Sequence, residues 1–155
     1  MRGRLLVPVA AVLLLAGCAP TVSLTAAPHA SSVGCAGIVV RLPDAIGGEA
    51  KRSTDAQGTA AWGVPASVTL TCGVATPQVS STTCTTVGGV DWLLQDHEVD
   101  GATWRSATTY GRDPGTQVLI DPKVADPGTV LGALADPIRA ATRVTAQCLS
   151  IGGTQ

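Results

Sequence analysis

The densest group of titratable side chains in the sequence is Asp96-His97-Glu98, which Asp100 follows closely. Two carboxylates flanking an imidazole could act as acid and base groups in a hydrolase or transferase of cell-wall material. Such chemistry needs a nucleophile or a second histidine nearby, and the other histidine, His29, falls in a segment with the composition of a linker. The chain also lacks the G-x-S-x-G and H-E-x-x-H patterns. We interpret the group as the solvated end of a hairpin and expect neither catalytic residues nor a cofactor. A hydrolase or transferase is the alternative.

Three tryptophans are the large side chains best suited to contact a ligand. Trp62 lies in a stretch of small residues, and Trp92 and Trp104 lie on the two arms of an expected hairpin. Rings at these positions could form a platform for a sugar or a peptide. Because the chain has only one Tyr and no Phe, we favour the interpretation that these rings fill the core and pack across strands.

Two arginines could bind an anionic group. Arg105 and Arg112, together with Tyr110, carry donors that can hold a phosphate or a carboxylate. We favour the other interpretation, in which they pair with surface carboxylates such as Asp91 or Asp113. With the three tryptophans, these two arginines make up the candidate surface for a ligand or a partner protein.

The first of the five cysteines directly follows a segment with the pattern of an export signal. A short basic start, Met1–Arg4, precedes an apolar run of 12 residues, Leu5–Ala16. As a helix this run would reach about 18 Å, well short of a hydrocarbon core of about 30 Å. It closes in Leu15-Ala16-Gly17-Cys18, which resembles the lipobox of bacterial lipoproteins. An ordinary secretory signal cut near Gly17 is the alternative.

Two or three acyl chains, palmitate among them, would anchor the protein durably through Cys18. We therefore expect a lipid-anchored protein on the outer face of the cytoplasmic membrane, with a signal peptide at residues 1–17. Residues 18–32 are rich in Ala, Pro, Thr and Ser, which predicts a flexible linker. A single domain then covers residues 33–150, and residues 151–155 form a tail.

The other four cysteines predict two disulfides, since an even number of cysteines in an exported chain indicates pairing. The alternative is a four-cysteine zinc site. The spacings between Cys35, Cys72, Cys84 and Cys148 contain no C-x₂₋₄-C pattern, so we expect no metal. Three pairings are possible. Cys35 and Cys148 each share a helical face with apolar residues, whereas Cys72 lies in an apparent strand and Cys84 ends a loop. We favour Cys35–Cys72 with Cys84–Cys148.

The hydrophobic pattern predicts a helix, then strands, then helices. A first helix capped by Ser31 or Ser32 runs to about Leu42, before a proline. Asp126-Pro127 and Asp136-Pro137 each join a capping residue to a proline suited to the first helical position, which predicts two consecutive C-terminal helices with a kink between them. The strands expected in the middle are a possible edge strand at 51–54 and strands at 67–74, 90–95, 103–109 and 116–120.

Asp100-Gly101 predicts a tight hairpin turn between two of these strands. The whole order predicts an α+β fold, with an antiparallel sheet of about four strands and with the N-terminal helix and the C-terminal helices packed on one face. The formal charge is −1, from 10 basic and 11 acidic residues without a basic cluster. This balance argues against a nucleic-acid partner.

Several stretches together carry a family resemblance. They are a Cys-containing first helix ending in Leu42-Pro43, then Ala61–Pro65, Cys72-Gly73-Val74, Val87–Trp92 and Tyr110-Gly111-Arg112. With these, the chain resembles the actinobacterial envelope family catalogued as domain of unknown function 3515, over most of residues 33–148. Thr71 stands where that family has Arg. The resemblance implies an exported, often lipidated single domain and supplies no reaction or catalytic residue. The expected function is therefore a non-catalytic envelope lipoprotein that binds an envelope protein or a small ligand.

Overall fold

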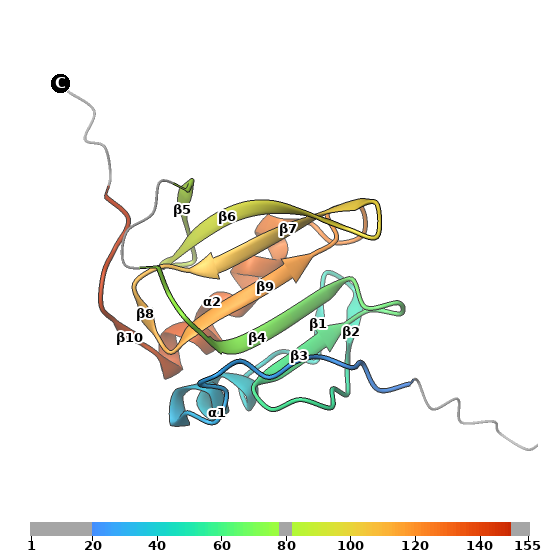
Figure 1. The fold of residues 1–155 in the computed structure, drawn as a ribbon, viewed down its shortest axis with the longest axis horizontal. Coiled ribbons are helices and arrows are strands. Elements are labelled where there is room, and N and C mark those ends of the chain that lie inside the picture. The colour runs from blue at the N-terminus through green and yellow to red at the C-terminus, as the bar shows by residue number, and fades with distance from the viewer. Residues whose placement is uncertain (1–19, 78–81, 150–155) are drawn as a thin grey trace, which may run out of the picture.

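The fold was obtained as a computed structural model, which describes residues 20–77 and 82–149. Two helices pack on an eight-stranded antiparallel sheet of order β1-β2-β3-β4-β9-β7-β6-β5, and β8 and β10 form a separate two-stranded sheet (Figure 1). The helices are α1 (Val33–Val39) and α2 (Pro127–Ala141). The strands are β1 (Ala45–Ile46), β2 (Glu49–Arg52), β3 (Thr59–Trp62), β4 (Val68–Val74), β5 (Cys84–Val87), β6 (Val90–Val99), β7 (Ala102–Thr109), β8 (Arg112–Asp113), β9 (Gly115–Ile120) and β10 (Arg143–Val144).

The core lies between the sheet and the helices. Val68 and Leu70 of the central strand β4 are two residues apart and point to the same face, and both are fully buried. They belong to the same hydrophobic cluster as Val130, Leu134 and Ile138 of α2, which are also fully buried. The pair β4–β9 joins the two halves of the sheet above this cluster.

The α+β class is confirmed, but the expected number of about four strands is wrong. The missed strands are short or lack alternation. Thr59–Trp62 is buried at every position, so a period of two is absent from its sequence. Cys84–Val87 begins at the cysteine that was expected to end a loop, and it pairs with β6 alone at the edge of the sheet.

The hairpin turn at Asp100-Gly101 is confirmed. β6 and β7 pair in register up to Val99 and Ala102, which leaves the two-residue turn between them. Asp100 and Gly101 have φ values of 50° and 75°, the positive values that a two-residue turn of this kind needs.

The two expected C-terminal helices are one helix. α2 runs through Pro137, which is buried. Val130, Leu134 and Ile138 form a continuous buried stripe at intervals of four residues, and burial of that stripe offsets the hydrogen bond that the proline cannot donate.

Two further helical expectations are wrong. Cys148 does not lie on a helix, because α2 ends at Ala141 and the chain becomes extended at Thr142 before it pairs as β10. The first helix is capped by Ser32, whose hydroxyl accepts from the Cys35 amide at 3.2 Å, but α1 ends at Val39 and not at Leu42.

Residues 20–32 lie against the domain, in contrast to the flexible linker expected from their composition. Val22 forms an isolated parallel bridge with Thr54, and its amide donates to the Ser53 carbonyl at 2.9 Å. Ala30 is only 6% exposed. The expected signal peptide with Cys18, and the expected tail at 151–155, lie outside the described residues. Among the helices that the structure describes, none has both the length and the apolar character to cross a bilayer.

Candidate ligand site

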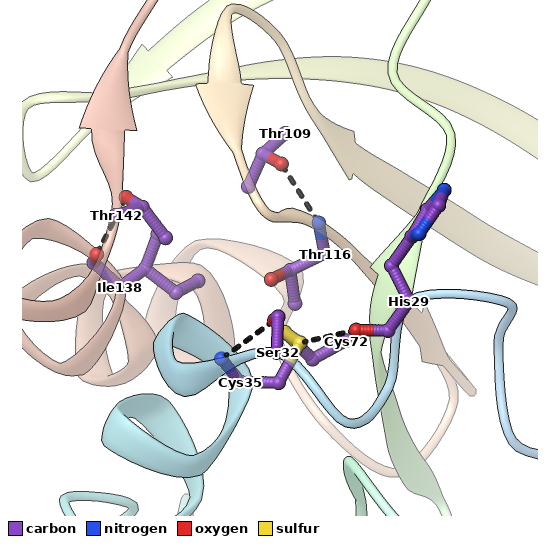
Figure 2. Close-up of a disulfide and its surroundings, with 8 residues drawn as sticks. All are labelled: His29, Ser32, Cys35, Cys72, Thr109, Thr116, Ile138 and Thr142. Atoms are coloured by element: carbon purple, nitrogen blue, oxygen red, sulfur yellow. Dashed lines mark hydrogen bonds between the residues drawn. A yellow bond between two sulfur atoms is a disulfide. The ribbon is translucent and has the colours of Figure 1, made fainter.

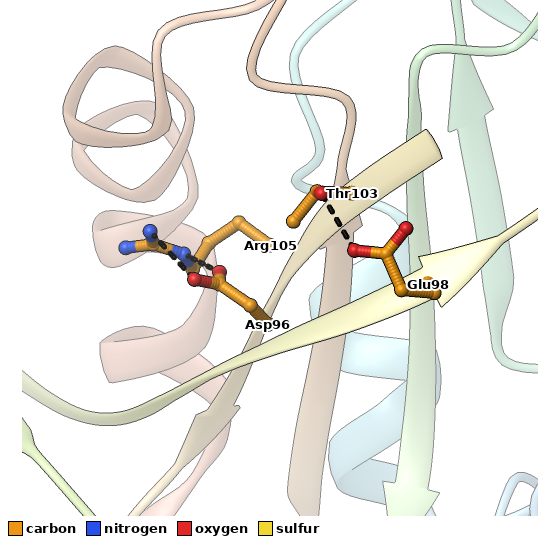
Figure 3. A network of polar contacts seen from close by, with 4 residues as sticks. All are labelled: Asp96, Glu98, Thr103 and Arg105. Carbon is orange, nitrogen blue, oxygen red and sulfur yellow. Dashed lines mark hydrogen bonds and ion pairs between the residues drawn. The ribbon is translucent and has the colours of Figure 1, made fainter. Parts of the chain in front are cut away.

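Asp96, His97 and Glu98 lie on β6 near the tip of the β6–β7 hairpin, and both carboxylates are engaged across the strands (Figure 3). The Arg105 guanidinium donates from Nε and Nη2 to the two oxygens of Asp96. The Thr103 hydroxyl donates to Glu98 Oε1 at 2.6 Å. This arrangement favours the solvated hairpin end over an acid–base pair. Within residues 20–77 and 82–149, no three His, Cys, Asp or Glu side chains gather where they could hold a metal ion.

Trp62 and Trp92 are fully buried in the core, and the hypothesis that they form a ligand platform is wrong. Trp62 Nε1 donates to the Pro43 carbonyl at 3.1 Å, which satisfies the polar atom of the ring. Trp104 is half-buried and lies opposite His97 in the register of the hairpin. The two buried rings fill much of the core, because the chain has no Phe and therefore few other large apolar side chains.

The disulfide Cys35–Cys72 has the expected pairing and fixes α1 to β4. Both residues are fully buried. Figure 2 shows the Ser32 hydroxyl capping the Cys35 amide beside this bond, with the His29 carbonyl oxygen 3.7 Å from the Cys35 sulfur. The bond is therefore enclosed by the first turn of α1 and by the segment that precedes it.

The disulfide Cys84–Cys148 also has the expected pairing but lies at the surface. Cys84 is exposed and Cys148 is half-buried. The bond ties β5 to residues 143–148, which follow α2 and are called the C-terminal strap below. The strap pairs with β8 through β10, and the Thr145 amide donates to the Gly111 carbonyl at 2.8 Å.

A pocket lies between the strap and the sheet, with a cavity volume of about 270 Å³. We call it the Arg112 pocket. It is formed where β5, the β5–β6 turn, the β7–β8 connection and the strap meet. Its lining residues are Thr86, Gly89, Asp91, Tyr110, Arg112, Val144, Ala146, Gln147 and Cys148.

Arg112 is the charged group best placed to act in this pocket. Arg112 is only 8% exposed, and its Nη2 donates to the Gly89 carbonyl at 2.7 Å. No ion pair within 4.0 Å involves this guanidinium among the described residues. Burial lowers the pKa of Arg112, the charge of Asp91 opposes that shift, and the like charge of Arg139 adds to it. The pocket thus holds a partly desolvated cation that is influenced by the negative charge of Asp91 and by the positive charge of Arg139.

Asp91 links the strap to β5, because each of its carboxylate oxygens accepts a hydrogen bond from one of these two segments. Oδ1 accepts from the Thr86 hydroxyl at 2.6 Å, and Oδ2 accepts from the Cys148 amide at 2.8 Å. The backbone carbonyl of Asp91 accepts from the Tyr110 amide at 2.7 Å. An anion could therefore approach Arg112 while Asp91 remains bound to the strap.

A family model described as "Protein of unknown function (DUF3515)" matches residues 5–147 of the chain. The chain belongs to the DUF3515 family. Neither the curated proteins nor the solved structures contain a match. Two stretches that carried the resemblance, Val87–Trp92 and Tyr110–Arg112, come together in this DUF3515 member at the Arg112 pocket.

Sequence reasoning named Arg112 and Tyr110 but missed the pocket and the strap. It grouped Arg112 with Arg105, which the structure places on the hairpin with Asp96 and outside the Arg112 pocket. The available signal was Gly111. A Cβ there would lie 1.9 Å from the Ala146 carbonyl oxygen, so this position admits only glycine while the strap is in place.

Proposed function

We propose that this DUF3515 protein is a lipid-anchored envelope protein whose domain binds an anionic ligand, without catalysis, in the Arg112 pocket. The anchor is a lipid on Cys18 at the outer face of the cytoplasmic membrane. Support for the anchor comes from the basic start, the apolar run and the lipobox-like tetrapeptide. Two disulfides in one small domain fit an oxidising compartment outside the cytoplasm.

The observation that carries the binding role is the buried Arg112 guanidinium, which makes no ion pair with a described residue. A planar guanidinium can hold a carboxylate or a phosphate through two parallel hydrogen bonds. Desolvation already weakens its charged form, so an anion that enters the pocket restores charge compensation. The cavity of about 270 Å³ suits a small acidic group, free or carried by an envelope protein.

A wall-acting hydrolase or transferase is the other candidate, and the geometry of the hairpin favours it less. Asp96 is held by Arg105, and Glu98 is held by Thr103. Acid–base chemistry here would first have to break these cross-strand contacts. Substitution of His97 and Asp96 by alanine should leave the cellular role intact. Loss of that role in variants that still fold and reach the membrane would favour the enzyme.

Binding is tested on the folded domain by following the Gly89 and Arg112 amide resonances during titration with inorganic phosphate and with succinate. The expected shifts cluster around the Arg112 pocket. The variant Arg112→Gln should weaken binding about 10- to 100-fold, the loss of one charge-assisted contact. The matched control is Arg105→Gln, which removes an equal charge from a half-exposed arginine on the hairpin. Absence of pocket shifts with both anions, or equal losses in the two variants, would contradict anion binding.

A further inference from the structure

The segment that leads into the domain is fixed to it along most of its length. The Pro20 carbonyl accepts from Arg52 Nη2. Two residues on, the Val22 amide donates to the Ser53 carbonyl at 2.9 Å, and the Val22 carbonyl accepts from the Asp55 amide at 3.3 Å. This pairing extends the backbone hydrogen bonding of the domain to the start of the described chain.

The second half of the segment is seated on glycines. The His29 amide donates to the Gly73 carbonyl at 3.1 Å. A Cβ on Gly73 would lie 2.3 Å from the carbonyl carbon of His29, and a Cβ on Gly58 would lie 3.0 Å from the Cβ of Ala30. Both glycines have positive φ values, 91° and 70°. The domain surface is thus shaped to receive residues 29–30 at close range.

Because residues 20–32 are docked, the chain that joins the domain to Cys18 is short. Only Ala19 stands between Pro20 and Cys18, so two Cα steps, about 7 Å, join the fixed segment to the anchoring residue. If residues 18–32 were a flexible coil, the domain would instead float at an r.m.s. distance of about 20 Å. The lipid would therefore hold the domain against the bilayer.

The β3–β4 turn lies beside Pro20, where the described chain begins. Arg52 binds Pro20 and also donates from Nη1 to the Gly63 carbonyl at 2.7 Å, which places the β3–β4 turn next to Pro20. Val64 at this turn is 72% exposed, followed by the exposed Pro65. In Figure 1 the described chain begins at one end of the long axis, and β5, β8 and β10 lie at the opposite end.

We infer that residues 20–32 are a rigid mount that seats the β3–β4 turn, with Val64 and Pro65, on the lipid surface and turns the Arg112 pocket away from it. The occupant of this surface is the bilayer interface that carries the Cys18 lipid. The inference rests on the proposed lipidation of Cys18. Charges near the turn balance, with Glu49 and Asp55 against Lys51 and Arg52, so the lipid and not electrostatic attraction supplies the contact.

The test uses the full-length lipidated protein in vesicles of phosphatidylglycerol and phosphatidylethanolamine. An environment-sensitive fluorophore is attached to Val64→Cys and, in a matched protein, to Val144→Cys. Val144 is 53% exposed and belongs to the strap. Lipids with a nitroxide near the headgroup should quench the label at position 64 several-fold more than the label at position 144. Ala66→Cys, in the same turn, is a second variant if Val64→Cys does not fold.

A third protein carries a Gly/Ser spacer of about 20 residues between Ala19 and Pro20, with an r.m.s. length of about 25 Å. The spacer should abolish the difference in quenching. Equal quenching at the two positions in acylated protein without the spacer would overturn the mount and leave the anchor standing. Stronger quenching at position 64 that persists with the spacer would also overturn the mount and leave the anchor standing. An unacylated Cys18 in the mass spectrum of the same sample would overturn both the anchor and the mount.

Discussion

Gly111 packs directly against the backbone of Ala146. The strap donates two backbone amides to the Gly111 carbonyl, from Thr145 at 2.8 Å and from Ala146 at 3.4 Å. A Cβ on Gly111 would approach the Ala146 carbonyl oxygen to 1.9 Å, and Gly111 has a φ of 59°. The closeness of these two residues is what brings the strap over the Arg112 pocket.

The variant Gly111→Ala should therefore displace the strap. Steric overlap and a strained backbone together should cost about 2–4 kcal/mol of unfolding free energy, measured by denaturant titration. The matched control is Gly132→Ala. Gly132 lies in α2, and a Cβ there would contact nothing within 4 Å, so this change should stabilise the protein by about 0.5–1 kcal/mol. A Gly111→Ala protein as stable as wild type would contradict the close approach.

The two disulfides should differ in their response to mild reductant. Cys84 is exposed, whereas Cys35 and Cys72 are fully buried, so a thiolate in solution can reach only the strap disulfide of the folded protein. Alkylation followed by mass spectrometry should find Cys84 and Cys148 modified first. Modification of the buried pair before the strap pair would show that the core opens more readily than the strap.

The tryptophans should separate by their effect on stability. Trp62→Phe changes a fully buried ring and leaves the half-buried Pro43 carbonyl without its indole donor, and it should cost about 1–3 kcal/mol. Trp104→Phe alters a half-buried ring on the hairpin and should cost less than about 1 kcal/mol. Thermal or denaturant unfolding measures both. A larger loss from Trp104→Phe would reverse the assignment of core and surface.

Docking of residues 20–32 should weaken in acid. The Leu24 amide and then the Ser23 side chain bind Asp55 and lower its pKa. A lowered pKa in the docked state means that the contact is fully present above the ordinary pKa of about 3.9. It is lost as the pH falls through the lowered value. The protection of the Leu24 amide, measured as its exchange rate relative to the intrinsic rate at the same pH, should therefore fall below about pH 4. Asp55→Asn keeps an acceptor oxygen without a charge and should flatten this dependence; an unchanged profile would contradict it.

Features that depend on residues close together in the sequence were predictable. Asp100-Gly101 specifies its hairpin turn, and Ser32 specifies the start of α1, because each acts on backbone atoms within three residues. The expected disulfide pairing is correct, but Cys148 does not lie on the helix that the sequence predicted for it. The helical pattern was therefore not a valid ground for the pairing.

Features that depend on contacts between distant segments were not predictable. The Arg112 pocket needs Gly89, Arg112 and Cys148 from three parts of the chain. Docking of residues 20–32 depends on Gly58 and Gly73 leaving room for a backbone far away in sequence. The composition of that segment describes a linker, and only the complementary surface makes it part of the fold.

The central claim, that a lipid on Cys18 holds a disulfide-bonded domain at the membrane, is tested most directly by intact mass. The protein is taken from the membrane fraction under non-reducing conditions, with and without thiol alkylation. The account predicts a chain that begins at Cys18, carries acyl chains and offers no alkylable thiol. An unlipidated mass, or alkylation of Cys35, Cys72, Cys84 and Cys148, would contradict it.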